Sequence, residues 1–381
     1  MAKKDVYERM CDFFGLQIGE VPDRDNLIRA FKQSLPLETA TFYFLFPMFG
    51  EISESQLRKK ARRKGYSQEE IEQHLGKLID ESFIEKHFGE PELRYARVFC
   101  VFVAENQVRK KKGTALGKRY AKFWMDLAEV STYNLPTKTP YARVLAAEES
   151  IPVAETKERI AINESIEETS QAVPYDFVTE MLRNTERIAL AECYCRLSMG
   201  MAGKPCEHEE ETCFLFDEAA RGVVEIGAAR YITLEEALEI VRRCEDAGLV
   251  HNTNNAQGKI TFMCNCCPCC CPILGALQKG LTNVGTPSHF MAEVDFDLCQ
   301  ACGTCTEVCY THALTLVDGA LAFEAESCIG CGLCAGRCPE GAITMAIREE
   351  TQPLFKTAAA LDAKIQREAI LGKAKAWITG K

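Results

Sequence analysis

The first third of the chain shows helical and strand-like patterns of apolar residues in a fixed order. The stretch ISESQLRKKARRKG predicts a short helix capped by Ser53, and YSQEEIEQHLGKLIDESF predicts a second helix capped by Ser67. The buried stripe of the second helix would consist of Ile71, Leu75, Leu78 and Ile79. The stretch FIEKHFGEPELRYARVFCVF alternates on both sides of a turn at residues 89–92, which predicts a β-hairpin. Helix, helix and hairpin in this order predict a winged-helix-like region over residues 1–113.

Later patterns predict further helices. Residues 114–190 are charged and helical, with NLPTKTPY and SIPVAET as linkers, and they carry no readable chemistry. The stretch YITLEEALEIVRRCEDAGLVH predicts a helix capped by Thr233 that buries Cys244 as a core residue. Residues 349–381 predict a C-terminal amphipathic basic helix. Its apolar positions are Leu354, Leu361, Ile365 and Ile370.

Composition indicates a globular chain with an unusual number of thiols. With 381 residues and 47% hydrophobic content, the chain can bury several cores, so its 21 cysteines do not compensate for a missing one. The longest uncharged apolar run, residues 39–50, is shorter than the roughly 20 residues of a membrane helix, so we expect a core helix and no membrane span. The N-terminus resembles no targeting segment, and we expect a cytoplasmic protein. The net charge of -10 argues against broad nucleic-acid binding.

The last third contains an internal repeat with cluster-binding spacing. The segments CQACGTCTEVCYTHALTL, from Cys299, and CIGCGLCAGRCPEGAITM, from Cys328, both read C-x2-C-x2-C-x3-C. In this spacing three close cysteines hold one [4Fe-4S] cluster and the fourth reaches the other cluster. We therefore predict two clusters, one held by Cys299, Cys302, Cys305 and Cys338 and the other by Cys328, Cys331, Cys334 and Cys309. A pair of structural zinc sites is the weaker alternative, because zinc ligands normally come as two pairs.

Residues 290–348 resemble the two-cluster bacterial-type ferredoxins. The eight cysteines in register carry this resemblance, and Pro339 matches the proline that follows the fourth cysteine in that family. Tyr310 stands where the first repeat would have the same proline. The resemblance implies a ferredoxin-like domain in which the two clusters are near neighbours.

A second concentration of thiols lies upstream, over residues 191–289. Ten cysteines are candidate ligands here: Cys193, Cys195, Cys206, Cys213, Cys264, Cys266, Cys267, Cys269, Cys270 and Cys271. A subset of them would hold a third iron–sulfur cluster, a structural zinc ion or, as the last alternative, a dithiol/disulfide site. Adjacent cysteines such as Cys266 and Cys267 should rarely bind one tetrahedral ion together. His208 and His251 could complete a mixed site, although we expect both on the surface.

The whole pattern resembles a family of largely uncharacterised 4Fe-4S proteins of anaerobic bacteria and archaea. The segments that carry this resemblance are the winged-helix-like start, CYCR, CNCCPCCC and the two-cluster tail. The resemblance implies cluster binding and no particular activity. The expected fold class is α+β and multidomain, with a winged-helix-like N-terminal region, a mostly helical cysteine-rich middle domain and a ferredoxin-like C-terminal domain.

Three functions fit these motifs. The sequence has no dinucleotide fingerprint, no P-loop and no defensible nucleophile–base set, so we predict an electron-transfer protein rather than an enzyme. It would relay low-potential electrons to an oxidoreductase partner and dock through its N-terminal helices. The alternative is a redox-sensing winged-helix DNA-binding regulator, supported by the basic run at residues 59–64 and opposed by acids on the next helix, such as Glu69 and Glu72. A third hypothesis is a catalytic site at the middle cysteines.

Overall fold

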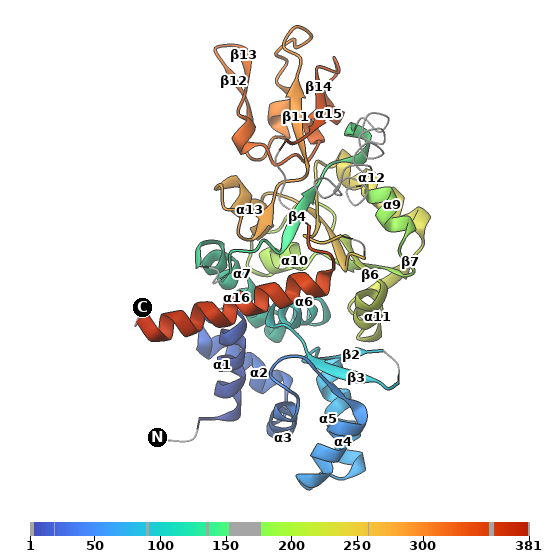
Figure 1. The fold of residues 1–381 in the computed structure, drawn as a ribbon, viewed down its shortest axis with the longest axis vertical. Helices are drawn as coiled ribbons and strands as arrows, with labels where there is room; N and C mark the ends of the chain where they lie inside the picture. The colour runs from blue at the N-terminus through green and yellow to red at the C-terminus, as the bar shows by residue number, and fades with distance from the viewer. Residues whose placement is uncertain are drawn as a thin grey trace.

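The structure is a computed structural model in which two end regions flank a central sheet. It describes residues 4–18, 20–88, 91–134, 137–151, 177–257, 259–349 and 354–379. The N-terminal helices lie at one end of the molecule, the two-cluster segment lies at the other, and the seven-stranded sheet lies between them (Figure 1). Within the described parts of the chain, no helix is long and apolar enough to cross a membrane.

The N-terminal region begins with helices and ends in a small sheet. Its elements are α1 (Val6–Ile18), α2 (Arg24–Ser34), α3 (Leu37–Phe42), η1 (Tyr43–Leu45), β1 (Glu51–Ser53), α4 (Glu54–Arg63), α5 (Gln68–Asp80), β2 (Ile84–His87) and β3 (Arg94–Arg97). The strands form an antiparallel sheet in the order β1-β3-β2. Both predicted caps are present, since Ser53 Oγ accepts from the Gln56 N–H and Ser67 with Glu70 forms a capping box.

The apolar run at residues 39–50 forms less helix than expected. Helix α3 ends at Phe42 and one 3-10 turn follows, because Pro47 removes a backbone donor and biases Phe46 towards extended geometry. The run still supplies core: Phe42 and Tyr43 are fully buried and Phe46 nearly so.

The middle of the chain contains a seven-stranded sheet, so our expectation of a mostly helical domain was wrong. Its strand order is β10-β4-β8-β9-β6-β5-β7, antiparallel except for the β10/β4 pair. The strands are β4 (Ala142–Leu145), β5 (Ile188–Glu192), β6 (Glu211–Phe216), β7 (Arg230–Ile232), β8 (Val250–Asn254), β9 (Phe262–Cys266) and β10 (Gly285–Thr286). Strands β4 and β8 are buried at every residue, and a strand covered on both faces does not alternate in a way that periodicity detects. Because β4 and β5 belong to this sheet, the region 114–190 is not purely helical.

Helices cover both faces of this sheet. They are α6 (Cys100–Lys110), α7 (Ala115–Asn134), η2 (Glu148–Ser150), α9 (Val178–Arg183), α10 (Tyr194–Met201), α11 (Asp217–Glu225), α12 (Leu234–Asp246) and α13 (Pro272–Gln278). Leu182 of α9 and Ile240 of α12 share an apolar cluster with Phe214 and Met263 of one sheet face. Helices α6, α7, α10 and α13 gather near β4 in the centre of the molecule (Figure 1).

The two-cluster segment is a small α+β unit. It contains β11 (Phe290–Val294), α14 (Thr304–Glu307), β12 (Leu314–Val317), β13 (Ala320–Phe323), η4 (Ala325–Ser327), α15 (Leu333–Arg337) and β14 (Ile343–Ile347). Strands β11 and β14 pair antiparallel, and β12 and β13 form a hairpin.

The predicted C-terminal helix is α16 (Ala358–Thr379), which runs back across the middle of the molecule (Figure 1). Its Leu361 is fully buried. The Glu368 carboxylate accepts hydrogen bonds from the Thr139 N–H at 3.0 Å and the Thr139 hydroxyl at 2.8 Å. The side chain of Ile370, predicted to share the apolar stripe, lies outside the described ones.

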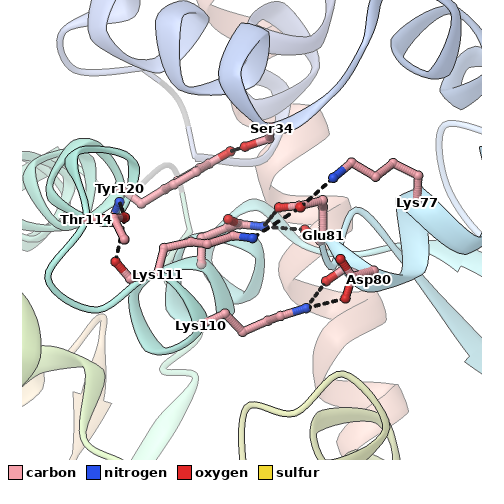
Figure 2. A network of polar contacts seen from close by, with 10 residues as sticks. Ser34, Lys77, Asp80, Glu81, Lys110, Lys111, Thr114 and Tyr120 are labelled. Atoms are coloured by element: carbon pink, nitrogen blue, oxygen red, sulfur yellow. Dashed lines mark hydrogen bonds and ion pairs between the residues drawn. The ribbon is translucent and has the colours of Figure 1, made fainter.

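The basic run VRKKKG, residues 108–113, forms ion pairs with acidic residues of the same chain. Lys110 pairs with Asp80 at 2.7 Å, Lys111 with Glu81 at 3.2 Å, and Lys112 with Glu192 and Glu210 at 2.6 Å each. Figure 2 shows the first two pairs joining the end of α5 to the end of α6. These lysines therefore hold the N-terminal region against the rest of the chain and are not a free surface for an acidic partner.

Glu81 is the centre of this polar network, and its replacement should change the acid stability of the protein. Burial raises the pKa of the Glu81 carboxyl, but hydrogen bonds from Lys77 and Gln107 and the charges of Lys77 and Lys111 outweigh burial and hold the pKa below its ordinary value. A lowered folded-state pKa contributes stability above the ordinary glutamate range, and this stability is lost as the pH falls through the folded value. Glu81→Gln should cost about 1–2 kcal/mol at neutral pH, with the difference from wild type shrinking below about pH 4.

Urea unfolding of both proteins from pH 3 to 8 measures this effect. Glu69→Gln is the matched control, because Glu69 is an exposed acid on α5, the helix that Glu81 follows. A pH-independent difference between wild type and Glu81→Gln would contradict the assigned role of the Glu81 charge.

Candidate iron–sulfur and metal centres

The first set of predicted cluster cysteines surrounds one hollow at the outer end of the molecule. This hollow is lined by Cys299, Cys302, Cys305 and Cys338, and we call these residues the outer cysteine group. Gly303, with a positive φ of 84°, opens α14 and lets the backbone turn tightly between the second and third thiols. The Ala301 N–H donates to Cys299 Sγ and the Ala342 N–H donates to Cys338 Sγ, at 3.4 and 3.3 Å.

The second set lies on the side that faces the central sheet. We call Cys309, Cys328, Cys331 and Cys334 the inner cysteine group. Burial, followed by the neighbouring Cys328 and Cys309 thiols, raises the pKa of Cys331 to about 12. The Leu314 N–H donates to Cys309 Sγ at 3.3 Å. A side chain at Gly330 would meet the Phe290 carbonyl oxygen, so only glycine allows this loop to approach β11 so closely.

Both groups suit [4Fe-4S] clusters. In neither group do three sulfurs lie within 4.8 Å of one another. This separation is expected when each thiolate binds a different iron of a cube, and it does not suit one tetrahedral ion. Backbone N–H groups aimed at the sulfurs are also the donors that tune such clusters.

The inner cysteine group is fixed to the central sheet by backbone contacts. The Ala147 N–H donates to the Cys331 carbonyl at 2.9 Å, and the Ser288 N–H donates to the Ile329 carbonyl at 3.0 Å. Tyr310, the departure from the ferredoxin pattern, donates its hydroxyl to the Gly248 carbonyl at 2.5 Å. A proline could not make this contact, so Tyr310 ties the two-cluster segment to the rest of the chain.

The ten middle cysteines separate into two sites. The first, which we call the four-thiol site, consists of Cys206, Cys267, Cys269 and Cys270, whose sulfurs all lie within 4.8 Å of one another. The Sγ–Sγ separations are 3.7 Å for Cys206–Cys267, 3.5 Å for Cys206–Cys269 and 3.6 Å for Cys269–Cys270. Zinc–sulfur bonds of about 2.3 Å in a tetrahedron place the sulfurs about 3.8 Å apart. The four-thiol site therefore has the dimensions of a mononuclear tetrahedral metal site.

The second, the six-thiol site, is a group of neighbouring thiols. Successive neighbours are Cys195, Cys193, Cys213, Cys264, Cys266 and Cys271, and Cys195 also lies near Cys264 and Cys271. Cys213 and Cys264 are cross-strand partners on β6 and β9, and Asn252 on β8 is the partner of Cys264 on its other side. Residues opposite one another in a sheet share a face, so these three side chains lie on one face. All six thiols except Cys264, which is half-buried, are buried.

Two buried arginines lie beside these thiols. Arg196 donates to the Thr212 hydroxyl at 2.6 Å and to the Asn265 carbonyl at 2.9 Å, and it also hydrogen-bonds Cys267 of the four-thiol site. Hydrogen bonds from Cys195 and Cys213, together with the Arg196 charge, hold the pKa of Cys193 well below its usual value. Arg109 pairs with Glu105 at 3.6 Å, and burial raises the pKa of that carboxyl to about 7.

The structure corrects two details of the sequence interpretation. Cys269 and Cys270 are adjacent and share one site, whereas Cys266 and Cys267 do go to different sites. His251 is not a surface residue: it is buried and contacts Asn265 Oδ1 at 2.5 Å and Glu245 Oε1 at 3.1 Å. Neither His251 nor His208 joins the four-thiol site.

The remaining cysteines are core residues. Cys11, Cys100 and Cys244 are at most 1% exposed. This confirms the prediction that Cys244 packs on the apolar face of its helix. Burial raises the pKa of Cys244 to about 12, which keeps this thiol protonated and inert.

Comparison with known proteins identifies the C-terminal segment. Residues 298–343 match the family model of the 4Fe-4S dicluster domain. Two uncharacterised ferredoxins of Methanocaldococcus jannaschii are similar to this chain: one is 48% identical over 50 residues and the other 45% identical over 47 residues. These matches cover 13% and 12% of this chain and 30% and 31% of the relatives, so the chain spans under a third of the length of the relatives it matches. The C-terminal segment of this chain is therefore a 4Fe-4S dicluster domain of the ferredoxin type.

Proposed function

We propose that this protein is an iron–sulfur electron carrier that relays low-potential electrons between a redox protein and an oxidoreductase partner. The observation that carries this proposal is the dicluster domain with its outer and inner cysteine groups. Two [4Fe-4S] clusters bound by these eight cysteines would each accept and release one electron. The two groups would have different roles, because the outer cysteine group is open to solvent and the inner cysteine group is packed against the central sheet.

The surface around the outer cysteine group suits a redox partner. Cys302 is exposed. Four large apolar side chains near this group in sequence or space are also exposed: Phe296 at 59%, Leu298 at 51%, Leu316 at 44% and Val317 at 55%. Residues 280–336 contain no lysine or arginine, while seven acids lie between Glu293 and Glu326. The fitting partner therefore presents apolar side chains ringed by basic ones.

This surface replaces the docking site expected from the sequence. The N-terminal helices lie at the opposite end of the molecule from the dicluster domain (Figure 1). A partner bound to those helices would be far from both cysteine groups. We therefore place docking at the outer cysteine group.

Replacing Phe296 and Leu298 tests this docking surface. The double variant Phe296→Ser, Leu298→Ser should accept electrons from a ferredoxin-reducing enzyme about ten-fold more slowly than wild type, because apolar contacts at an interface centre each contribute roughly 1 kcal/mol or more. Reduction by dithionite, which needs no docking surface, should be unchanged. Stopped-flow absorbance of the anaerobically purified protein measures both rates.

Tyr231→Ser is the matched control, because Tyr231 is 49% exposed on the central sheet. An equal rate for the double variant and wild type with the enzyme would remove the docking surface from the proposal. Failure of wild type to take up electrons from either reductant would overturn the electron-carrier function itself.

We also propose a structural zinc ion at the four-thiol site. Four thiolates in a closed tetrahedron are typical of structural zinc, which leaves no open position for a substrate. The site joins the loop that carries Cys206 to the segment that carries Cys267, Cys269 and Cys270. Zinc here would stabilise the middle region without taking part in electron transfer.

A DNA-binding regulator remains the alternative function. Helices α4 and α5 with the β2/β3 hairpin would form a winged helix, and Arg58, Lys59, Arg62 and Arg63 line a hollow on α4. Arg58, however, pairs with Glu54 and Glu72, and the exposed first turn of α5 carries Glu69 and Glu70. These acids would repel DNA phosphates at the helix that should enter the groove. Sequence-selective, salt-dependent binding to a DNA fragment in a gel-shift assay would favour the regulator instead.

A further inference from the structure

The six-thiol site contains more sulfur than one ion can use, and its sulfurs are spaced differently from those of the four-thiol site. We propose that the six-thiol site holds a third iron–sulfur cluster, polynuclear and separate from the zinc site and from the two clusters of the dicluster domain. The cofactor of the six-thiol site would therefore be of the same class as the cofactors of the dicluster domain.

The spacing of the sulfurs indicates several metal atoms. The six thiols are neighbours, with Cys195 near both Cys264 and Cys271, yet no three of their sulfurs lie within 4.8 Å of one another. One zinc ion, or two zinc ions that share thiolates, requires three or four sulfurs packed around a point. The four-thiol site, a few residues away in sequence, has that packing and the six-thiol site does not. Thiolates spaced in this way suit a four-iron cluster in which four of the six sulfurs each bind a different iron.

Two buried arginines lie beside the thiols of this site, an arrangement that suits thiolates. Arg196 is 2% exposed, and among the described residues no carboxylate lies within ion-pair distance of it. A buried guanidinium needs a nearby negative charge. The thiols of Cys193 and Cys267 are the groups near Arg196 that can supply it, and Cys193 and Cys213 are likewise near the buried Arg109. Thiols bound to metal are deprotonated and carry that charge permanently.

A buried polar atom at the site lacks a partner. Asn252 is fully buried, and its Oδ1 atom has no hydrogen-bond partner among the described residues. Asn252 is the cross-strand neighbour of Cys264 and shares its face of the sheet. A buried acceptor without a partner indicates an absent donor or cation beside Cys264, which fits a metal centre but does not distinguish iron from zinc.

The position of the site favours iron over zinc. Cys266 and Cys271 share an apolar cluster with Ile329 and Leu333, which flank Cys331 of the inner cysteine group. The six-thiol site is therefore packed against the inner cysteine group, while the outer cysteine group faces solvent. An iron–sulfur cluster here would be the innermost of three redox centres that run from the surface to the middle of the molecule, close enough to the inner cysteine group to exchange electrons with it.

Metal analysis of the full-length protein, purified without oxygen, tests this proposal. Wild type should contain about twelve irons, about twelve acid-labile sulfides and about one zinc per chain, because each cube contributes about four of each atom. The double variant Cys213→Ser, Cys264→Ser should lose about four irons and four sulfides. It should keep its zinc and the electron paramagnetic resonance signals of the dicluster domain. Cys244→Ser is the matched control, because it removes a buried thiol that belongs to no site, and it should change none of these values.

Three results would overturn the proposal. These are about eight irons with about three zinc ions in wild type, about eight irons with disulfides among the six thiols, and a folded double variant that retains all its iron. Mössbauer spectra of 57Fe-labelled wild type provide a measurement that does not depend on folding of the variant. They should show a third set of iron signals, and spectra accounted for by the two ferredoxin-type clusters alone would also overturn it.

Discussion

Replacing Arg196 with methionine should lower the free energy of unfolding by about 3–5 kcal/mol, because the change leaves a buried network without its central cation. Arg196 donates to the Thr212 hydroxyl and to the carbonyls of Glu209 and Asn265, so these three acceptors would lose their donor. It also lies between the four-thiol and six-thiol sites and neutralises thiolates of both. The loss of this charge should weaken metal retention at both sites.

Arg242→Met is the control for this change, because Arg242 is an exposed arginine on α12 and its replacement should shift stability by less than about 0.5 kcal/mol. Urea unfolding under anaerobic conditions gives the free energies, and zinc and iron analysis after gel filtration gives the metal retention. Equal stability and equal metal content of Arg196→Met and wild type would show that the thiols do not depend on this charge.

Replacing Cys206 with serine should release the zinc ion and lower the free energy of unfolding by about 2–4 kcal/mol. Cys206 is the one ligand of the four-thiol site that lies outside the segment from Cys267 to Cys270, so its loss also frees the loop before β6. Glu207 in that loop is exposed, and the glutamate-specific protease Glu-C should cleave after it much faster in the variant than in wild type.

The matched variant for this experiment is Cys302→Ser, which belongs to the outer cysteine group. It should lose about four irons and keep its zinc, whereas Cys206→Ser should keep its iron and lose zinc. Zinc release is measured with a colorimetric chelator, and cleavage by mass spectrometry of the Glu-C fragments. A Cys206→Ser protein that retains one zinc ion would assign that metal to other ligands.

Local sequence signals were sufficient to predict those elements that depend on residues close together in the sequence. The caps at Ser53, Ser67 and Thr233 each begin a helix, because a side chain that accepts from an N–H three residues later acts within one turn. The dicluster domain was recognisable for the same reason: three of the four thiols of each group lie within seven residues. The fourth thiol of each group, Cys338 or Cys309, was assigned by the repeat and not by any property of its own neighbourhood.

Most of the central sheet was not predicted, because its causes are long-range. Strand β8 contains the buried polar residues His251, Asn252 and Asn254, which look like a loop in sequence. Their polar atoms are placed by partners far along the chain: His251, for example, contacts Asn265, and Arg196 donates to the Asn265 carbonyl. A strand that is polar and buried on both faces has no periodic signal, so only its neighbours show that it is a strand.

By itself, the sequence determined that this protein binds metal through thiolates and that its C-terminal segment has the cysteine spacing of a two-cluster ferredoxin. Only the tertiary structure divided the ten middle thiols into two sites. The physical reason is the geometry of strand and turn: Cys264 and Cys266 project from the same face of β9, while Cys267 lies beyond the end of the strand and faces Cys206. Adjacent cysteines in CNCCPCCC therefore belong to different sites, and the chain brings distant Cys193, Cys195, Cys206 and Cys213 to complete them.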